Sequence, residues 1–410
     1  MWVCGTKMQP RDCIRNAWQA EIATSQRNTI FRASGIKWYM RIRAGLIGFI
    51  AFFQFVLLLI HLFLYETWTY SSAGNPTPGA LWLKVTVGVL SVSFLITSLL
   101  AFRYTNAMLR AVYRVAAVWL GWLSFFFFAA CVSWVVFGMA RLAEMDLNFH
   151  RIAEVLFGAA AVLGFSGVVN AGWTRIRRIT VRLENLPLAW RGRTAALVSD
   201  LHLGHVRNGR FLKRIIGKTM REKPDVVFLA GDLFDGTAID AMRAAEPLRE
   251  LRAPQGAYFV AGNHEQFGDD SKYLRAVSNA GVRVLQNEKV EADGLQIVGV
   301  PYNHATHEGH LRSVLQQIGV DKNRASILLI HAPDRPHIPA EAGFSLQLSG
   351  HTHLGQFFPW TWMVRRIYRQ FAYGLSRIGK MQVYTSSGAG TWGPPLRLGS
   401  NSEIVMLCFE

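Results

Sequence analysis

The sequence is poor in cysteine and in acidic residues, and both shortages argue against certain kinds of protein. Only four cysteines occur among 410 residues, none in a CxxC pair, at positions 4, 13, 131 and 408. Such scattered cysteines argue against a disulfide framework or a zinc ribbon and favour free thiols. Asp and Glu number 27 against 44 Lys and Arg, so the formal net charge is +17. No basic recognition helix or aromatic RNA-binding platform gathers this charge, so we do not expect nucleic acid as a partner.

Long apolar runs crowd the first 172 residues, and four of them reach the roughly 20 residues that cross a bilayer. They lie at about 44–64, 80–102, 115–137 and 152–173. A soluble helical core is the alternative, but these runs lack a polar face. We therefore expect four transmembrane helices within 44–173 after a basic segment at 1–43. The first run is too long for a cleaved signal peptide. Too few polar groups lie in the spans for a transport pathway, so the bundle is interpreted as an anchor.

Positive charge predicts the topology of these helices. Eight Lys or Arg precede the first run, and further groups of Arg follow the second and fourth runs. The loop at 65–79 carries none, and the loop at 138–151 mixes two Arg with acidic residues. Both termini are therefore predicted to be cytoplasmic, in an integral protein of a bacterial inner or plasma membrane.

After about residue 179 the pattern changes to short β-branched runs that alternate with amphipathic stretches. Strands are predicted at 194–199, 225–230, 257–261, 295–300, 326–330, 345–349, 381–385 and 403–409. Helices are predicted near 207–222, 238–253, 271–281 and 308–320. This alternation predicts α/β layers with a buried sheet, in a C-terminal domain at 179–410.

Polar residues of the types that bind metals directly follow five of these strands. They are Asp200, His202, Asp232, Asn263, His331, His351 and His353. Ligands bind at the carboxyl ends of strands in α/β sheets, so we expect these side chains to meet. Carboxylates with neutral imidazoles suit manganese, iron or zinc, and seven ligands are too many for one ion. Two divalent ions sharing a carboxylate could clamp a phosphoryl group and activate a water as the nucleophile.

The alternative is that each of these residues has an ordinary structural role, as a single histidine after a strand usually has. The DxH triplet at 200–202 is weak on its own, because such triplets are common. GDxxD at 231–235 and GNHE at 262–265 are more specific, and GHTH at 350–353 completes the order. Together these motifs, in this order, are poorly explained by chance.

This order of motifs resembles the calcineurin-like metallophosphoesterase superfamily over about residues 179–410. The resemblance implies a four-layer α/β/β/α sandwich, placed after the N-terminal four-helix transmembrane region, with its active site at the strand ends. It implies that Asp232 bridges two ions. One ion would also bind Asp200, His202 and His353, and the other Asn263, His331 and His351.

The resemblance also implies roles for residues that do not bind metal. His264 would face the substrate and stabilise or protonate the leaving oxygen, Asp235 would orient its imidazole, and Glu265 would support the ligands. The segments GHTHLGQFFP and SSGAGTWGPPLRLGSNSEI are similar to a branch of membrane-associated bacterial phosphoesterases. Relatives often carry Gly in place of Leu354 and Asn in place of Ala332, which bears on substrate preference and removes no ligand.

Three further features are candidates for substrate or lipid contact. His205 closely follows the DxH motif and could contact a substrate phosphate. The stretch 357–380 interleaves aromatic residues with basic ones, including Arg365 and Arg366, and such a helix or loop suits a bilayer interface. An insertion packed on its own domain is the equal alternative. The GxGxxG pattern at 388–393 is followed by two prolines, so a loop beside the active site is favoured over a dinucleotide site.

The leading hypothesis is a metal-dependent hydrolase of a phosphate ester, diester or pyrophosphate in a membrane lipid or lipid-linked molecule. A site tethered under the bilayer meets lipids at a high effective concentration. Two alternatives remain open: a phosphodiesterase for a soluble nucleotide, and a membrane scaffold that binds without turnover. The substrate, the native metals and the oligomeric state do not follow from the sequence.

Overall fold

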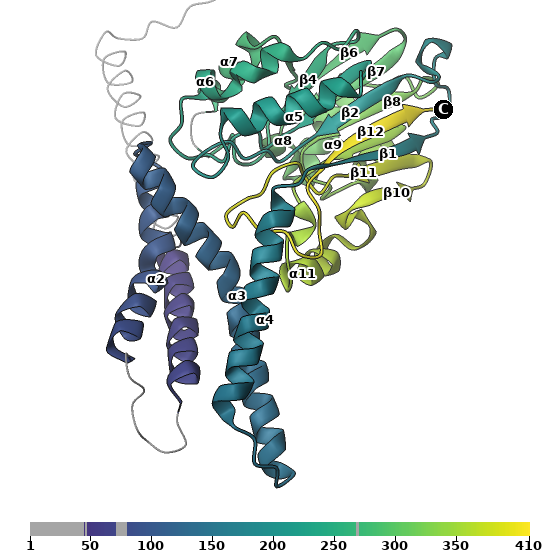
Figure 1. Cartoon of the computed structure of the whole chain (residues 1–410). Coiled ribbons are helices and arrows are strands. Elements are labelled where there is room, and N and C mark those ends of the chain that lie inside the picture. The colour runs from purple at the N-terminus through teal and green to yellow at the C-terminus, as the bar shows by residue number, and fades with distance from the viewer. Residues whose placement is uncertain (1–44, 46, 71–79, 268–269) are drawn as a thin grey trace, which may run out of the picture. The chain divides into compact units, whose positions relative to one another are not determined.

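The computed structural model describes residue 45 and residues 47–70, 80–267 and 270–410 (Figure 1). The expected basic segment at 1–43 lies outside these residues. The chain divides into two compact units after His61, and every labelled element below belongs to the second unit, Leu62–Glu410. Among the described residues, four helices are long and apolar enough to cross a membrane: Ile47–Thr69, Leu81–Ala101, Ala107–Leu142 and Phe149–Ala171.

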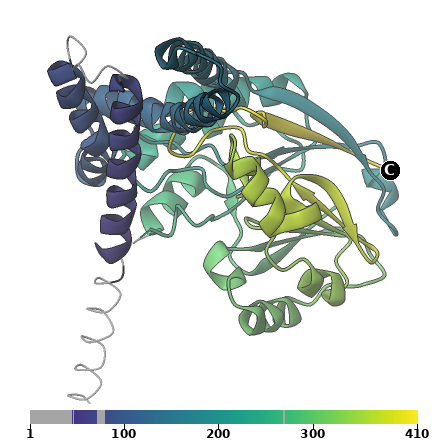
Figure 2. The same cartoon turned by 90° about the horizontal axis from the view of Figure 1, so that it is seen from below.

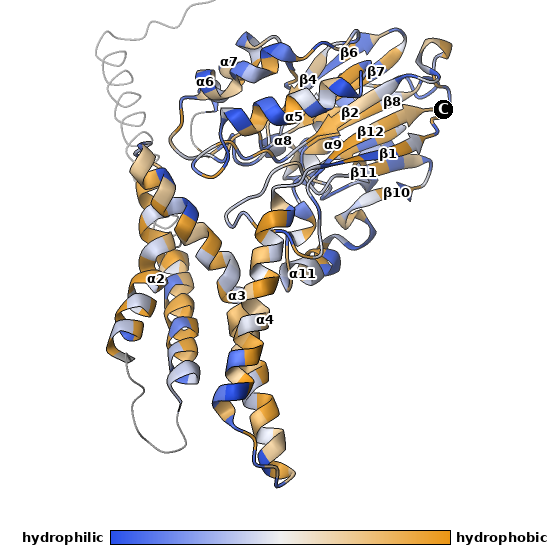
Figure 3. Cartoon of the chain, in the orientation of Figure 1, coloured by the Kyte–Doolittle hydropathy of each residue, from blue (hydrophilic) through white to orange (hydrophobic). Residues whose placement is uncertain are grey.

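The last three of these spans are helices α2 (Ala80–Ala101), α3 (Ala107–Leu142) and α4 (Phe149–Ala171). Orange, hydrophobic residues dominate all three (Figure 3). Helix α3 has 36 residues and exceeds the predicted 115–137 at both ends. Asn106 begins it by accepting a hydrogen bond from the backbone N–H of Leu109 at 2.7 Å. Its polar ends were missed because the prediction rested on hydropathy alone.

The C-terminal half contains two six-stranded sheets. The first has the order β1 (Arg175–Val181), β12 (Glu403–Phe409), β2 (Thr194–Val198), β3 (Val226–Ala230), β4 (Ala257–Val260) and β5 (Arg283–Val284). The second has the order β10 (Gly374–Ile378), β11 (Met381–Thr385), β9 (Leu346–Ser349), β8 (Ser326–Ile330), β7 (Leu295–Val300) and β6 (Glu288–Ala292). Strands β2, β3 and β4 are parallel neighbours, as are β7, β8 and β9. Each sheet therefore presents several carboxyl ends along one edge.

Helices cover the outer faces of the two sheets. Beside the first sheet lie α5 (Gly209–Arg221), α6 (Ala241–Ala245), α7 (Ser271–Asn279) and the 3-10 turn η2 (Glu246–Glu250). Beside the second lie α8 (Tyr302–Ala305), α9 (Glu308–Ile318) and α10 (His337–Ala342). The remaining short elements are η1 (Leu188–Trp190), η3 (His353–Gly355), α11 (Trp360–Tyr368) and η4 (Arg369–Ala372).

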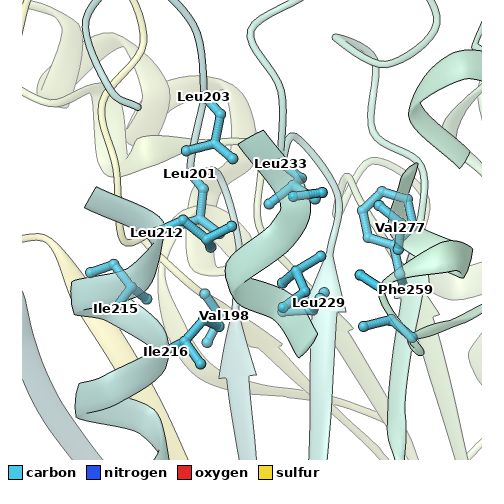
Figure 4. Packing of buried hydrophobic residues seen from close by; sticks show 14 of the residues in the cluster. Val198, Leu201, Leu203, Leu212, Ile215, Ile216, Leu229, Leu233, Phe259 and Val277 are labelled. Carbon is cyan, nitrogen blue, oxygen red and sulfur yellow. The ribbon is translucent and has the colours of Figure 1, made fainter. Parts of the chain in front are cut away.

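Three hydrophobic cores hold these layers together. In the first, Leu212, Ile215 and Ile216 of α5 face Val198 and Leu229 of the sheet (Figure 4). A second core joins the inner faces of the two sheets, which lie against each other in the view from below (Figure 2), and a third lies under α9 and α10. The layers are thus helix, sheet, sheet and helix, which confirms the expected four-layer sandwich.

The α/β domain joins the membrane helices closely. Only residues 172–174 separate α4 from β1, so the first sheet begins at Arg175 rather than near 179. Leu396 and Phe357 of the domain pack in one hydrophobic cluster with Phe125 and Ala160 of α3 and α4. The Arg207 guanidinium also donates to the carbonyl of Ala171 at the end of α4, at 2.8 Å. The helices and the domain therefore share a packed, hydrogen-bonded interface.

Candidate metal centre

The seven side chains predicted to bind metal converge at the strand ends. Asp200 and His202 follow β2, Asp232 follows β3 and Asn263 comes three residues after β4. His331 follows β8, and His351 and His353 follow β9 in the other sheet. Because parallel strands end at the same edge, segments separated by up to about 150 residues meet in one buried group.

Asp200, His202 and His353 form the first half of this group. The Nε2 atoms of His202 and His353 are 2.9 Å apart, and His353 Nε2 is 3.6 Å from Asp200 Oδ1. All three side chains are buried. His202 Nδ1 has no hydrogen-bond partner, so the protein provides no competing contact that would turn this ring away.

Asp232, Asn263, His331 and His351 form the second half. His331 Nε2 is 3.1 Å from Asp232 Oδ2 and 3.2 Å from Asn263 Oδ1. His351 Nδ1 is 3.0 Å from Asn263 Oδ1. Asp232 Oδ2 is also 3.7 Å from His202 Nε2 in the first half. One carboxylate therefore stands between the two halves, as a bridging ligand must.

The spacing and the donor types fit two divalent ions. Two donors bound at about 2.1 Å and at right angles lie about 3 Å apart, close to the separations of 2.9–3.2 Å between neighbouring donor atoms. Two triads, Asp200–His202–His353 and Asp232–His331–His351, each have ligand atoms within 4.8 Å of one another, and a third, His202–Asp232–His264, joins them. Mixed carboxylate, amide and imidazole donors suit borderline metals.

The backbone is held in a rare conformation at this group. Five of the seven residues have φ between 48° and 72°: Asp200, His202, Asp232, His351 and His353. Left-handed backbone at a non-glycine residue costs about 1 kcal/mol or more and concentrates at functional sites. Two glycines allow close approach, because a Cβ at Gly262 or Gly350 would lie within 2.3 Å of a carboxylate oxygen of Asp232 or Asp200. The chain therefore accepts strain to aim these ligands.

Burial and mutual charge set the protonation of the group. Burial raises the pKa of Asp200 to about 6. At Asp232 burial opposes ionisation, but the neighbouring His331 outweighs it and lowers the pKa. Burial lowers the pKa of His202 and His353 well below the usual range, and burial together with His331 lowers that of His351 to about 3. These three imidazoles are neutral at pH 7, the form that binds metals.

Glu265 ties two of the ligand-bearing turns together. Its buried carboxylate accepts hydrogen bonds from the backbone N–H groups of Asp232, Phe234 and Gly262, at 2.7–2.9 Å. Burial, with the charge of Asp232, raises its pKa to about 8. The supporting role expected for this residue therefore acts on the backbone of the metal-binding turns.

His264 lies beside the group with its imidazole nearly buried. Its Nδ1 is 3.0 Å from the backbone oxygen of Asp235, and its Nε2 is 4.0 Å from Asp232 Oδ2. An Nδ1–H that donates to this carbonyl leaves Nε2 directed toward the metal ligands. The Asp235 carboxylate instead accepts from the N–H and the hydroxyl of Thr237. The contact of Asp235 with the ring is thus made by its backbone oxygen.

The three predicted substrate-contact residues lie apart from the ligands. His205 is buried, with Nδ1 at 3.1 Å from the Thr237 hydroxyl and Nε2 at 2.9 Å from the carbonyl of Tyr104, just before α3. Its ring nitrogens are thereby engaged in joining the domain to the α2–α3 connection. Arg365 and Arg366 are exposed on α11, on the protein surface. The same helix reaches the metal group through Tyr368, whose ring centroid is 6.3 Å from that of His351.

Arg397 was missed by the sequence analysis. It is fully buried, and its guanidinium donates to the carbonyls of His353, Ser387 and Gly390 at 3.2, 2.6 and 2.7 Å. Its backbone N–H donates to Gly167 of α4 at 2.9 Å. Arg397 is the only charged residue within 386–402, which is the one signal that could have singled it out. The loop expected beside the active site at 388–393 does lie there, since Gly390 N–H donates to the carbonyl of Asp200.

These observations define a two-sheet α/β domain with a candidate dimetal site, attached to apolar spanning helices. Comparison with known proteins agrees. Residues 194–355 match the profile of the calcineurin-like phosphoesterases. A Campylobacter jejuni metallophosphoesterase is 30% identical over 69% of this chain and 77% of its own length. A Danio rerio transmembrane protein with a metallophosphoesterase domain is 32% identical over 61% of each chain.

The chain belongs to the calcineurin-like phosphoesterase family. Members of this family bind two divalent metals, and the two halves of the group fit that property. A solved structure of a Danio rerio dimetal phosphatase is also similar, with 14% identity and a TM-score of 0.34 over 48% of this chain and 88% of that one.

Proposed function

We propose that this protein is a membrane-anchored, metal-dependent phosphoesterase that hydrolyses a phosphate ester, diester or pyrophosphate bond of a membrane lipid or lipid-linked molecule. The observation that carries the proposal is the convergence of seven ligand-type side chains around Asp232, next to the His264 imidazole, whose Nε2 is 4.0 Å from Asp232 Oδ2. Two divalent ions of manganese, iron or zinc in this group would clamp the phosphoryl oxygens and lower the pKa of an attacking water.

The side chains of the centre have different roles in binding the metal ions and in proton transfer. Asp200 and Asp232 supply negative charge, and the neutral imidazoles keep the site open to a cation. His264 holds its Nε2 toward this group and is placed to give a proton to the leaving oxygen. The Asp235 backbone oxygen keeps that ring in one orientation, and Glu265 keeps the turns at Asp232 and Gly262 in register.

The surface around α11 supports a substrate that lies in the membrane. None of the residues of α11 is buried. Exposed large apolar residues gather on it and just before it: Phe358, Trp360, Trp362, Met363 and Ile367. Arg365, Arg366 and Arg369 are exposed beside them. Apolar and basic side chains on one short helix suit the boundary of an anionic bilayer.

Contacts with α3 support a position of α11 at the depth of the bilayer. The rings of Phe357 and Phe358 pack on those of Phe125 and Phe128, at 5.9 and 5.1 Å. These lie between Arg114 and Arg141, where α3 has no charged residue. At 1.5 Å per residue that stretch is about 40 Å long, and Phe128 lies about 20 Å from Arg141. If Arg141 marks the far surface of a hydrocarbon layer of about 30 Å, α11 begins inside the near leaflet.

The orientation that we propose places the α/β domain in the cytoplasm. Arginines at the domain end of the spans support it, since Arg103 lies between α2 and α3, Arg110 and Arg114 lie near the start of α3, and Arg175 begins β1. Cysteine labelling of single-cysteine variants in intact cells tests this orientation, with Glu410→Cys protected and Glu144→Cys reactive toward an impermeant reagent.

The function is tested with the full-length protein in detergent and in proteoliposomes. The assay compares a phospholipid ester, a lipid-linked pyrophosphate, a nucleotide diester and a generic aryl phosphodiester, each with manganese, iron or zinc and with a chelator. We expect metal-dependent hydrolysis that is fastest for the lipid substrates in the bilayer. Faster turnover of the nucleotide diester than of the lipids would indicate a soluble substrate instead of a lipid. No metal-dependent turnover of any substrate would favour the non-catalytic scaffold.

A further inference from the structure

Two exposed aromatic side chains stand beside His264. Phe267 is 53% exposed and Trp392 is 56% exposed. Their ring centroids lie 4.6 and 5.5 Å from that of His264, and both rings meet the imidazole at steep angles of 61° and 63°. A single exposed aromatic residue is common, but two that meet at one nearly buried polar side chain form an apolar rim around it.

Hydrogen bonds hold Trp392 in this position. Its backbone N–H donates to Gln356 Oε1, and its carbonyl accepts from Gln356 Nε2, both at 2.9 Å. Gln356 is itself buried three residues after His353, and its backbone carbonyl accepts from the N–H of Leu398 and the hydroxyl of Ser400. One side chain thus holds both backbone polar groups of Trp392 next to a residue of the metal centre.

Phe267 is held by packing. A Cβ placed on Gly236 would come within 2.7 Å of the Phe267 ring, so the ring lies directly on this glycine. Gly236 has a φ of 82°, which a side chain would strain in addition. Both rings therefore keep an apolar face toward solvent although the fold positions them, as expected of a surface that a ligand covers.

The Trp392 loop continues directly into the membrane helices. Leu396, four residues on, is fully buried against α3 and α4, and a Cβ added at Gly121 or Gly167 would lie 3.2 or 2.9 Å from it. Four residues span about 14 Å at most, so Trp392 lies close to these helices. The apolar rim at His264 is therefore joined to the membrane helices through the Trp392 loop.

We propose that Phe267 and Trp392 form a subsite for the leaving group, and that it takes the apolar body of a lipid alcohol. This inference rests on the proposed function. In the reaction a water oxygen forms a bond to phosphorus, the phosphorus–oxygen bond to the leaving group breaks, and the leaving oxygen takes a proton from His264. The proton released by the attacking water restores that imidazole. Groups flanking His264 therefore flank the leaving group. Continuity with α3 and α4 selects a lipid over a soluble alcohol.

The test uses the full-length protein in detergent with esters that share a phosphoryl group and differ only in the leaving alcohol. Ethyl and dodecyl phosphate serve, or diethyl and didodecyl phosphate if the wild-type protein prefers diesters, because either ester oxygen then gives the same leaving alcohol. These alcohols have similar acidity, so chemistry alone does not separate them. We expect Trp392→Ala and Phe267→Ala to lower kcat/KM for the dodecyl ester on the order of ten-fold, chiefly through KM. The ethyl ester should change by less than about two-fold, because it leaves the apolar rim uncovered.

Three controls make the result specific. Trp392→Phe should restore most of the preference, since it keeps an aromatic face. Leu188→Ala, at an exposed apolar residue outside the centre, should leave both esters unchanged. Equal metal content in all variants shows that the fold of the centre is intact.

Equal losses on both esters, or no loss on either, would overturn the subsite. A larger loss on an adenosine ester than on the dodecyl ester would overturn the choice of a lipid. Failure of the wild-type protein to hydrolyse any ester would instead remove the proposed function, so the two failures can be told apart.

Discussion

In the spanning helices several hydroxyl side chains bond within their own helix, whereas in the metal centre polar groups from five strand ends meet one another. Thr67, Thr97 and Ser133 each donate to a backbone carbonyl four residues earlier, at 2.7–2.8 Å. In the centre, by contrast, His331 and His351 each approach side chains from distant segments within about 3 Å. These hydroxyl groups are satisfied within their own helix, which supports our interpretation of the helices as an anchor. The chemistry is concentrated in the α/β domain.

The two regions meet through the loop at 386–402. Arg397 contacts the carbonyl of His353 with its guanidinium and that of Gly167 with its backbone N–H. Asn170 of α4 donates back to the carbonyl of Arg397 at 3.0 Å. The membrane helices therefore also support the metal centre from one side. Changes at the centre should abolish turnover, and changes at the membrane side should alter it selectively.

The largest effect is expected from Asp232→Ala. This carboxylate stands between both halves of the centre, so its loss should remove metal and reduce hydrolysis to the background of the assay. Metal analysis and turnover of the purified full-length variant check both results. Asp146→Ala, an exposed carboxylate in the α3–α4 connection, is the matched control. Retained metal and turnover in Asp232→Ala would show that the two halves do not share this ligand.

The next effect is expected from His264→Ala, which should keep the metal and lose rate by roughly 10²–10⁴-fold, as is typical of a general acid. The reason is that Nε2 points toward the centre but is 4.0 Å from Asp232 Oδ2, and we assign the ring to the leaving group and not to a metal ion. Turnover and metal content are measured side by side, with exposed His310→Ala as the control. A parallel loss of metal would assign His264 to the ligands instead.

A smaller effect, on stability, is expected from Glu265→Ala. Three buried backbone N–H groups would lose their acceptor, at about 1–3 kcal/mol each. Thermal unfolding of the detergent-solubilised protein should therefore shift to clearly lower temperature. Glu265→Gln keeps one acceptor oxygen and should fall between wild type and the alanine variant. Equal melting temperatures for all three would mean that water replaces the carboxylate.

The smallest effect is expected on α11. Charge reversal at Arg365, Arg366 and Arg369 should slow hydrolysis of a lipid substrate several-fold in anionic proteoliposomes, since each basic group near an anionic surface contributes about 1 kcal/mol. A soluble ester should be hydrolysed at an unchanged rate. Reversal of exposed Arg221, Arg243 and Arg249 matches the net charge change on another face. Equal slowing by both triple variants would mean that only overall charge matters.

The sequence predicted the interior of each sheet and missed its borders. The eight predicted strands are the interior ones, and β1, β5, β6 and β10 are the four edges. An edge strand has one neighbour and partial cover, so it need not be apolar. β6 reads EKVEA and β1 reads RIRRITV, which carry no continuous hydrophobic signal. A hydrophobic pattern in the sequence indicates a buried strand, and these edge strands are only partly buried.

The ligands could be predicted because each directly follows a buried apolar strand. The contacts that surround them could not, since they depend on side chains brought in by turns and by the membrane helices. The backbone oxygen of Asp235, rather than its carboxylate, contacts His264, because the carboxylate accepts hydrogen bonds from Thr237 two residues later. Arg397 and Trp392 gained their places only through the packing of Leu396 between α3 and α4. The residues next to Arg397 and Trp392 in the sequence do not indicate this packing.

The central claim is that seven side chains hold two ions with Asp232 between them. Anomalous scattering from crystals of the full-length protein loaded with manganese tests it most directly. We predict two anomalous-difference peaks about 3.5–4 Å apart. One should lie within reach of His202 and His353 and the other within reach of His331 and His351. A single peak, or peaks away from these imidazoles, would contradict it.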